Sequence, residues 1–407
     1  MAANVDCCIA GGGPAGLMLG FLLARAGCRV TVLEKRADFL RDFRGDTIHP
    51  STLEVMLELG LLDKFLMLPH QKVERLSGIF GDTPLKFADF TRLPVHARYI
   101  AMMPQWDFLN FLAVEGRRYP GFDLRMNAEA TGLLIEGNDV VGVRGKQDGK
   151  PFEVRTALTV AADGRSSVLR AQSGLTAEDF GAPMDVLWLR LPRAGGDTEE
   201  TMARFLPGRI FIMLNRGDYW QCALVIPKGG NDAVRSAGLP AFAESVGRVV
   251  PFIAERLRGL TSFDEVKLLT VQVNRLKKWW RPGLLCIGDA AHAMSPIGGV
   301  GINLAVQDAV AGANILAVPL REGRAGEAEL TAVERRRAGP AKMTQAMQLM
   351  MQKRIIAPVL ARPDQPVRPP LLLRVLSALP MTRRLIARVI GLGFRPEHVA
   401  PGIGPVR

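Results

Sequence analysis

A glycine-rich turn near the start of the chain limits the possible folds more than any other feature. Residues 11–16 read Gly-Gly-Gly-Pro-Ala-Gly and follow residues 5–10, an apolar run with the length of a buried strand. Residues 14–26 are predicted to form a helix, and residues 29–34 a second strand. A strand, a tight glycine turn, a helix and a second strand make the βαβ unit that opens a parallel sheet.

Each glycine of this turn has its own predicted task. Gly11 permits the tight turn, Gly13 lets the backbone approach a pyrophosphate, and Gly16 lets helix and strand pack closely. The helix N-terminus adds N–H groups and a partial positive charge. Glu34 can accept hydrogen bonds from an adenosine ribose. A chain with 42 glycines can match this pattern by chance, and the pattern alone does not separate FAD from NAD.

A second motif separates the two cofactors. The apolar run 284–287 is followed directly by Gly-Asp-Ala-Ala-His at residues 288–292. Asp289 can bind a ribityl chain, which FAD contains and NAD lacks; the alternative is that it only stabilises a turn. A helix predicted at about 299–317 directs its positive end just beyond Pro296. The motif therefore predicts FAD.

Two positions in the first turn of that helix have a predicted role in the chemistry. A reduced flavin carries negative charge at its pyrimidine edge, so the N–H groups of Ile302 and Asn303 would stabilise it.

A third motif lies between the other two. Asp163-Gly164 follows an apolar strand, and Ser167 and Arg170 come shortly after. The segment could contact the cofactor, or it could simply be a capped helix start with Arg170 in a salt bridge. The two roles can coexist.

The remaining pattern predicts an α/β fold with an inserted sheet. Residues 76–99 and 181–273 alternate apolar and polar positions between Gly, Pro and Asp, as antiparallel strands do. We expect a Rossmann-like FAD-binding domain with an inserted antiparallel β-sheet substrate domain and C-terminal helices. The predicted boundaries are 1–75, 100–178 and 276–330 for the FAD-binding domain, 76–99 and 179–275 for the substrate domain, and 331–407 for the helical region.

Charge is concentrated at the end of the chain. The formal net charge is +12, and residues 321–407 hold 16 Lys/Arg against 6 Asp/Glu. This region interleaves arginine with Leu, Ile, Met and Pro, which argues against nucleic-acid binding. Met381, Leu385, Val389 and Leu392 share one helical face, beside Arg383, Arg384 and Arg388. That face could pack on the body of the protein or make weak peripheral contact with an anionic membrane.

The cysteines and the N-terminus predict a cytoplasmic protein. There are five cysteines, an odd number, and at least four lie in apolar runs, so neither a disulfide framework nor a metal site is expected. The first strand begins at Val5, and no basic segment precedes it, which argues against a signal peptide.

With these three motifs the chain resembles the group A flavoprotein monooxygenases, the para-hydroxybenzoate hydroxylase type of aromatic hydroxylase. The resemblance covers residues 5–320, and the run from Gly288 to Asn303 is its most specific part. It implies that NAD(P)H reduces FAD, that O2 adds at the flavin C4a atom, and that the resulting hydroperoxide hydroxylates an aromatic ring.

The resemblance also implies roles for individual residues. Arg44 and Gln105 would flank the flavin, Asp289 would bind the ribityl chain, and Asp163 would connect flavin and nicotinamide binding. Many relatives have arginine at the position of Gln105, which puts its contact in doubt. The residues implied to hold the ADP portion are Gly11, Gly13, Pro14, Ala15, Gly16, Glu34 and Lys35. Those implied to face the reacting edge are Pro296, Gly298, Gly301, Ile302 and Asn303, with Pro296, Gly298 and Arg44 as the catalytic set.

Candidate substrate contacts lie on the predicted strands of the inserted sheet. They are Phe211, Met213, Trp220, Gln221 and Ala223, with Trp188 on a neighbouring strand. Core packing is the alternative for each of them. The substrate would be an aromatic, mostly apolar small molecule. His49, His292 and Tyr219 are weak candidates for a catalytic base.

Other functions remain as alternatives. The fold would also suit a flavin-dependent epoxidase, a quinone or isoprenoid hydroxylase at a membrane surface, or a non-catalytic prenyl-binding protein. Intact glycines, Glu34 and Asp289 argue against the last of these. Halogenation is a minor alternative, because the WxWxIP signature is absent and Trp220 is followed by Gln-Cys-Ala-Leu-Val-Ile-Pro.

Overall fold

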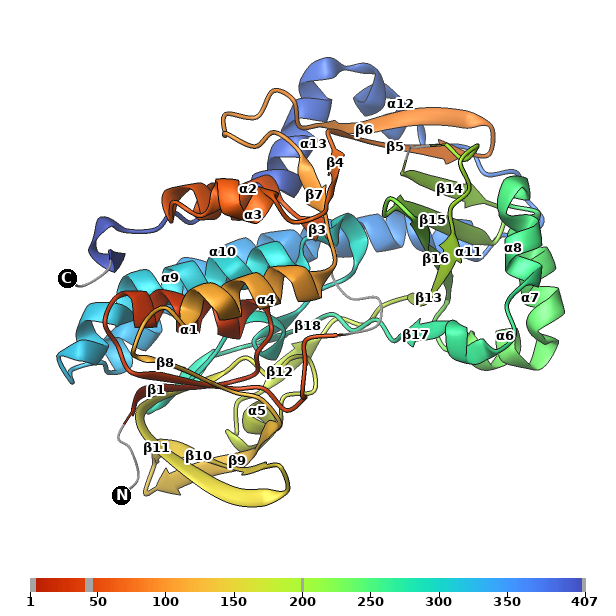
Figure 1. Cartoon of the computed structure of the whole chain (residues 1–407). Helices are drawn as coiled ribbons and strands as arrows, with labels where there is room; N and C mark the ends of the chain where they lie inside the picture. The colour runs from red at the N-terminus through yellow and green to blue at the C-terminus, as the bar shows by residue number, and fades with distance from the viewer. Residues whose placement is uncertain (1–4, 41–46, 199–200, 405–407) are drawn as a thin grey trace.

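The largest sheet carries the glycine-rich turn. The computed structural model describes residues 5–40, 47–198 and 201–404. Five strands pair in parallel in the order β20-β11-β1-β2-β8 (Figure 1). They are β1 (Val5–Ala10), β2 (Val30–Leu33), β8 (Phe122–Arg125), β11 (Lys150–Ala161) and β20 (Leu284–Cys286). Antiparallel pairing adds β19 (Trp280–Arg281) to β20, and β10 (Asp139–Gln147) and β9 (Ala128–Glu136) to β11.

Helices bury this sheet in a continuous apolar core. The register places Leu285, Val160, Ile9 and Val32 in one row, and none of them is exposed. Helix α1 (Pro14–Arg25) contacts α4 (Gln105–Gly116) and α9 (Gly301–Arg321). The segment that contains α9 is long and apolar enough to span a membrane, but 83% of its most apolar window is buried inside the protein. We therefore treat α9 as a core helix.

Two glycines are required by the βαβ turn. Gly11 has φ +108°, and a Cβ there would lie 2.3 Å from the carbonyl oxygen of Ala162. A Cβ on Gly16 would lie 1.9 Å from the Gly11 carbonyl oxygen. A side chain on Gly11 would collide with the backbone that follows β11, and one on Gly16 would push α1 away from the turn after β1.

A second sheet of seven strands has the order β17-β13-β16-β15-β14-β5-β6. Its strands are β5 (Arg75–Phe80), β6 (Thr83–Asp89), β13 (Met184–Pro192), β14 (Met202–Leu206), β15 (Arg209–Asn215), β16 (Tyr219–Pro227) and β17 (Lys267–Leu269). The α/β fold class is confirmed, with one correction. The sheet is not wholly antiparallel, because β5 and β14 run parallel. The domain boundaries stay a prediction.

Helices cover both faces of the second sheet. One face packs against α6 (Asn231–Ala237), α7 (Leu239–Gly247) and α8 (Ala254–Arg258). The other face shares an apolar cluster with α11 (Ala357–Leu360) and with Ile297, which lies close to α9. Ile297 therefore joins this face to the turn that follows Pro296.

Shorter elements connect the two large sheets. One small sheet joins β3 (Thr47–Ile48), β7 (Ile100–Met102) and β4 (Gln71–Val73), and another joins β12 (Ala177–Asp179), β18 (Asn274–Leu276) and β21 (His292–Ala293). The remaining helices are α2 (Pro50–Glu58), α3 (Leu62–Leu66), α5 (Val168–Gln172), α10 (Glu327–Met351), α12 (Leu371–Ala378) and α13 (Pro380–Leu392), with a π-helical turn at Gln352–Ile356. Single 3-10 turns lie at Pro251–Ile253, Phe263–Glu265, Gly288–Ala290, Ile297–Gly299 and Pro401–Ile403.

A fully buried carboxylate joins α9, α10 and the C-terminal segment. Asp308 Oδ1 accepts from Arg337 Nε at 3.0 Å, and Oδ2 lies 2.6 Å from His292 Nε2 and accepts from the Gly288 N–H at 3.0 Å. Arg337 Nη1 also donates to Glu397 at 3.0 Å. Burial alone would raise the pKa of Asp308, but His292 and Arg337 hold that pKa below its usual value.

This network predicts an unequal effect of two neighbouring arginines. Arg337→Met should lower the free energy of unfolding by about 3–5 kcal/mol, because the fully buried Asp308 would lose its arginine and Glu397 would keep only Arg336. Arg336→Met is the control, since the partly exposed Arg336 also binds Glu397 and its loss should cost about 1 kcal/mol. Urea unfolding followed by circular dichroism measures both. If both variants lost the same free energy of unfolding, burial of the ion pair would not explain the effect of Arg337.

Candidate functional site

The predicted motifs meet at one edge of the large sheet. Residues 11–16 follow β1, Glu34 follows β2, Asp163 follows β11, and Gly288 follows β20. These four strands are neighbours and run parallel, so their carboxyl ends lie side by side. Ligands of parallel α/β sheets bind at this edge. Segments up to about 280 residues apart in the chain are thereby brought together.

The glycine turn leaves an open position at its centre. A Cβ on Gly13 would have no heavy atom within 4 Å, and Gly13 caps α1 with Pro14 as the first helical residue. Ala15 is buried beneath the second motif, because a Cβ on Gly288 would lie 3.0 Å from the Ala15 Cβ. A helix N-terminus with an unobstructed backbone suits the pyrophosphate of a dinucleotide.

Glu34 fixes the glycine turn through hydrogen bonds to backbone N–H groups. One carboxylate oxygen accepts from the Gly12 N–H at 3.1 Å and the other from the Arg36 N–H at 3.0 Å. The side chain is buried, whereas Lys35 next to it is exposed. Glu34 therefore orders the phosphate-binding loop, and its contact with a ribose stays a prediction, as does a role for Lys35.

The Asp163 segment is a capped helix start. Asp163 Oδ2 accepts from the Val168 N–H at 2.9 Å, and the Ser167 hydroxyl accepts from the Arg170 N–H at 2.9 Å. The capped-helix alternative also included a salt bridge of Arg170, but within the described residues its Nη1 donates to the Ala290 carbonyl at 3.0 Å and its Nη2 to the Arg165 carbonyl at 2.5 Å. The carbonyl of Ala290 lies in a turn beside Arg170, and a buried backbone carbonyl needs a hydrogen-bond donor, which the guanidinium supplies.

One oxygen of Asp163 remains available. Burial raises the pKa of this carboxyl, and Oδ1 has no hydrogen-bond partner among the described residues. Asp289 lies in the 3-10 turn Gly288–Ala290, which follows the neighbouring strand β20; its side chain is 36% exposed and lies 3.6 Å from Arg165 Nη2. Two carboxyl groups from adjacent strand ends thus offer acceptor atoms at this edge.

The start of α9 presents unused backbone donors. Gly298 and Gly299 have φ +81° and +65°, and the Thr47 hydroxyl donates to the Gly299 carbonyl at 2.8 Å. Leu304 donates to the Val300 carbonyl, but the N–H groups of Ile302 and Asn303 find no acceptor within the described parts of the chain. A Cβ on Gly301 would also meet open space. These donors fit the negative edge of a reduced flavin.

Asn303 is fixed by its side chain. Its Oδ1 accepts from the hydroxyls of Ser51 and Thr52 on α2, and its buried Nδ2 has no partner in the described structure. Pro296 is half-buried and precedes the turn Ile297–Gly299. Gln105 is the first residue of α4 and is half-buried. Arg44 lies outside the described residues, and its roles stay a prediction.

The structure separates the predicted substrate residues onto two faces. Phe211, Met213 and Trp220 are buried against α7 and α8, and Trp220 Nε1 donates to Asp197 at 2.7 Å. Gln221 and Ala223 lie on the opposite face because side chains alternate along a strand. Phe211, Met213 and Trp220 are therefore core residues in this structure, which matches the packing alternative.

On the opposite face, Trp188, Gln221 and Ala223 were predicted substrate contacts, whereas Ile212 and Arg190 were not. Trp188, Ile212 and Ala223 share the cluster of Ile297, and Trp188 Nε1 is buried without a hydrogen-bond partner in the described structure. The guanidinium of Arg190 lies 4.9 Å from the ring centre of Tyr219 and 5.4 Å from that of Trp106, beside Gln105. Alternation along the strands was visible in sequence, but it did not show which face meets the cofactor domain.

Neither His49 nor His292 lies where it could act as a catalytic base, because both are buried and bonded within the protein. His49 is fully buried with Nδ1 2.9 Å from the Ile390 carbonyl, and burial lowers its pKa to about 4. His292 is buried against Asp308. Tyr219 is half-buried beside Arg190.

Comparison with known proteins agrees with this geometry. The model of the family described as FAD binding domain matches residues 4–347. The 6-methylpretetramide 4-monooxygenase of Streptomyces rimosus is 32% identical over 95% of this chain and 92% of its own length. Rifampicin monooxygenase of Streptomyces venezuelae is 28% identical over 75% of this chain, which spans 62% of that protein. The fold of the anhydrotetracycline hydroxylase OxyS from Streptomyces rimosus matches 95% of this chain and 76% of its own, with a TM-score of 0.75 at 23% identity.

Substitution of two glycines of the turn should distinguish an effect on FAD binding from an effect on folding. Gly13→Ala should leave the free energy of unfolding of the apoprotein within about 1 kcal/mol, because the added Cβ meets no protein atom. It should weaken FAD binding about tenfold or more, because the Cβ occupies the space of the pyrophosphate. Fluorescence titration of apoprotein with FAD and urea unfolding give the two quantities.

Gly11→Ala is the matched control. Its positive φ and its 2.3 Å approach to Ala162 should destabilise the apoprotein by about 1–3 kcal/mol. Unchanged FAD affinity in Gly13→Ala would show that the pyrophosphate does not lie at this turn.

Proposed function

We propose that the chain, which belongs to the FAD binding domain family and has monooxygenases among its relatives, is an FAD-dependent monooxygenase that hydroxylates a polycyclic aromatic small molecule. One observation carries this proposal. The open glycine turn at Gly13, the unpaired Oδ1 of Asp163 and the unused backbone N–H groups at the start of α9 all lie at one edge of the sheet. When bound, FAD supplies the redox chemistry and activates O2. The protein supplies binding, orientation and exclusion of water.

Each part of the edge has a proposed task in holding the cofactor. Gly13 and the N-terminus of α1 would bind the pyrophosphate, and Glu34 would keep the turn in shape. Asp289 would accept hydrogen bonds from the ribityl chain. The N–H groups of Ile302 and Asn303 would stabilise negative charge on the reduced cofactor. Pro296 and Gly298 would stand at the reacting edge.

The substrate would bind beneath the second sheet. Trp188, Ile212 and Ala223 offer a largely apolar face that reaches Ile297, and the unpaired Trp188 Nε1 can donate one hydrogen bond. Arg190, stacked between Tyr219 and Trp106, adds positive charge at the side of α4. A broad aromatic compound with a phenolic or enolic oxygen suits this combination, and two relatives are named as monooxygenases of 6-methylpretetramide and of rifampicin.

NAD(P)H is the proposed electron donor, and O2 the co-substrate. The sequence has no second glycine-rich turn of the GxGxxG type, which agrees with a donor that binds transiently. The Asp163 carboxyl, with its free Oδ1, is the residue we propose to link nicotinamide and flavin binding.

The decisive test is spectroscopic. Purified protein should show flavin absorption, and anaerobic NADH or NADPH should bleach it faster when a suitable member of a panel of phenols, quinones and polycyclic aromatics is present. Product analysis after admission of O2 should then show one added oxygen atom. A colourless protein that FAD cannot reconstitute would instead favour the prenyl-binding alternative.

A pair of tryptophans tests the substrate face. Trp188→Phe should raise KM about five- to tenfold for the compound that stimulates reduction, because one hydrogen-bond donor is lost. Trp220→Phe should leave KM unchanged and lower stability, because its Nε1 bonds Asp197 in the core. Steady-state oxygen consumption gives KM. An unchanged KM in Trp188→Phe would remove this residue from the substrate site.

A further inference from the structure

The hairpin of α12 and α13 exposes an unusual number of apolar side chains. Leu371, Leu372, Val375, Leu379, Met381 and Leu385 are all exposed, and α12 has no buried residue. The hairpin rests on β6 and α2 through the other side of α13, where Ala387, Gly391 and Leu392 are buried. The predicted face is therefore divided: Leu392 packs on the protein, whereas Met381 and Leu385 face outward.

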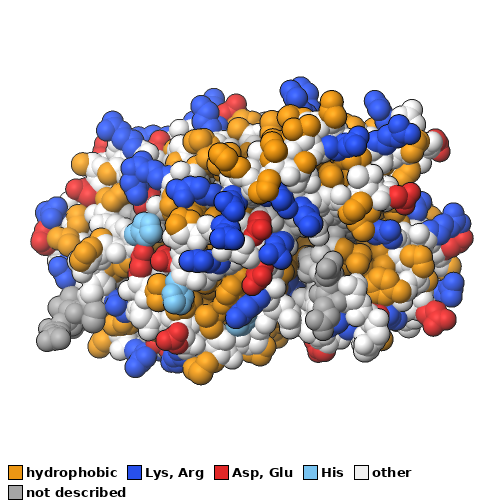
Figure 2. Space-filling view, turned by 90° about the horizontal axis from the view of Figure 1, so that it is seen from above, with side chains coloured by type: hydrophobic (Ala, Val, Ile, Leu, Met, Phe, Trp, Pro, Cys, Tyr) orange, Lys and Arg blue, Asp and Glu red, His pale blue; other side chains and the backbone are white. Residues whose placement is uncertain are grey.

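The same segment carries only positive charge. Residues 365–396 contain six arginines and no aspartate or glutamate. Figure 2, which looks onto the end of the molecule where α12 and α13 lie, shows basic side chains interleaved with hydrophobic ones. Apolar side chains bordered by arginines on a short helical hairpin have the chemistry of an interfacial anchor, because the arginine stems can lie along apolar surface while their heads reach phosphates.

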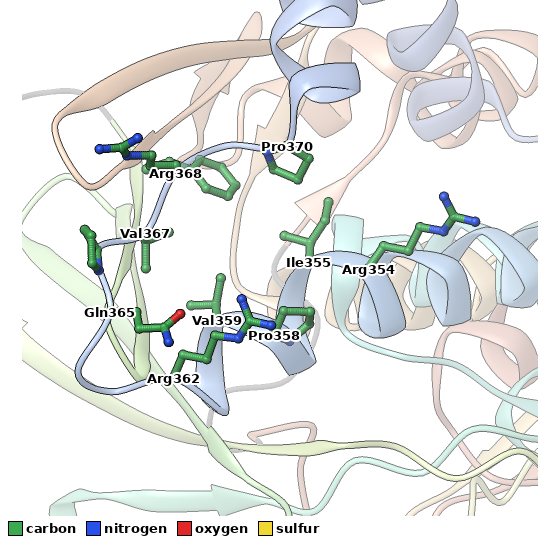
Figure 3. A pocket seen from close by; sticks show the side chains of 11 residues that line it. Arg354, Ile355, Pro358, Val359, Arg362, Gln365, Val367, Arg368 and Pro370 are labelled. Carbon is green, nitrogen blue, oxygen red and sulfur yellow. The ribbon is translucent and has the colours of Figure 1, made fainter.

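A neighbouring pocket extends the positive charge. It has a volume of about 340 Å³ beside the start of α12, and its lining includes Arg354, Arg362 and Arg368 but no acidic residue. Figure 3 shows Arg354 and Arg368 directed away from the centre of the pocket, while Arg362 and Gln365 point toward it. Arg354 and Arg368 therefore add positive charge to the surface near the start of α12 and do not point into an enclosed binding site.

We infer that this hairpin docks the protein onto an anionic lipid surface. Leu371, Leu372, Val375, Leu379, Met381 and Leu385 enter the acyl boundary, and the arginines at 368, 374, 384 and 388 contact the headgroups. A second copy of this chain fits the surface less well, because a two-fold interface would set arginine against arginine. The inference stands independently of the proposed activity.

The docking can be measured with the intact FAD-loaded protein and sedimented vesicles. Binding is expected to vesicles of phosphatidylcholine mixed with phosphatidylglycerol, to be weak on phosphatidylcholine alone, and to fall as salt is raised. Met381→Glu and Leu372→Glu should each reduce partitioning about tenfold, and Arg384→Gln about fivefold.

Met67 provides a matched control. It is 78% exposed, as is Met381, but it follows α3 and is not part of the hairpin. Met67→Glu should bind vesicles like the parent protein. FAD content and thermal unfolding should be unchanged in all these variants, which separates lost docking from lost fold. Equal binding to neutral and anionic vesicles, equal effects of Met67→Glu and Met381→Glu, or a dimer that Met381→Glu dissociates would each overturn the inference.

Discussion

The carboxylate of Asp308 is the group on which the arrangement of this protein depends. It is wholly buried on α9, yet it is balanced by His292 and Arg337 and accepts the N–H of Gly288. A buried charge is tolerated only where partners replace its lost hydration. Asp308 therefore sets the position of the turn that presents Asp289, and it ties that turn to α10 and, through Glu397, to the C-terminal segment.

The parallel sheet explains how distant segments form one site. Parallel strands end at the same edge, so each loop after β1, β2, β11 and β20 contributes to a common surface. The second sheet then closes over this edge through Ile297, whose side chain joins the cluster of Trp188 and Ala223. The surfaces proposed for cofactor and substrate are in this way joined by one short turn.

The sequence predicted the parts of the fold that local patterns determine. The strand, glycine turn and helix at residues 5–25 were predictable because each glycine there has a steric reason. The burial of Phe211, Met213 and Trp220 in the core was not predictable from the sequence. Alternation along a strand shows that the sheet has two faces, but it does not show what covers each face. The partners of Arg170 and Arg337 and the parallel pairing of β5 with β14 depend on contacts between remote residues, which no local pattern records.

The link between Asp308 and Glu397 also sets an order on biosynthesis. A ribosome delivers the glycine turn, the Asp289 segment and α9 well before it delivers Glu397, so Arg337 is synthesised before one of its two carboxylate partners exists. Domains generally fold as units while the chain emerges. The buried charge network of Asp308, Arg337 and Glu397 can therefore form in full only after residue 397 has been synthesised.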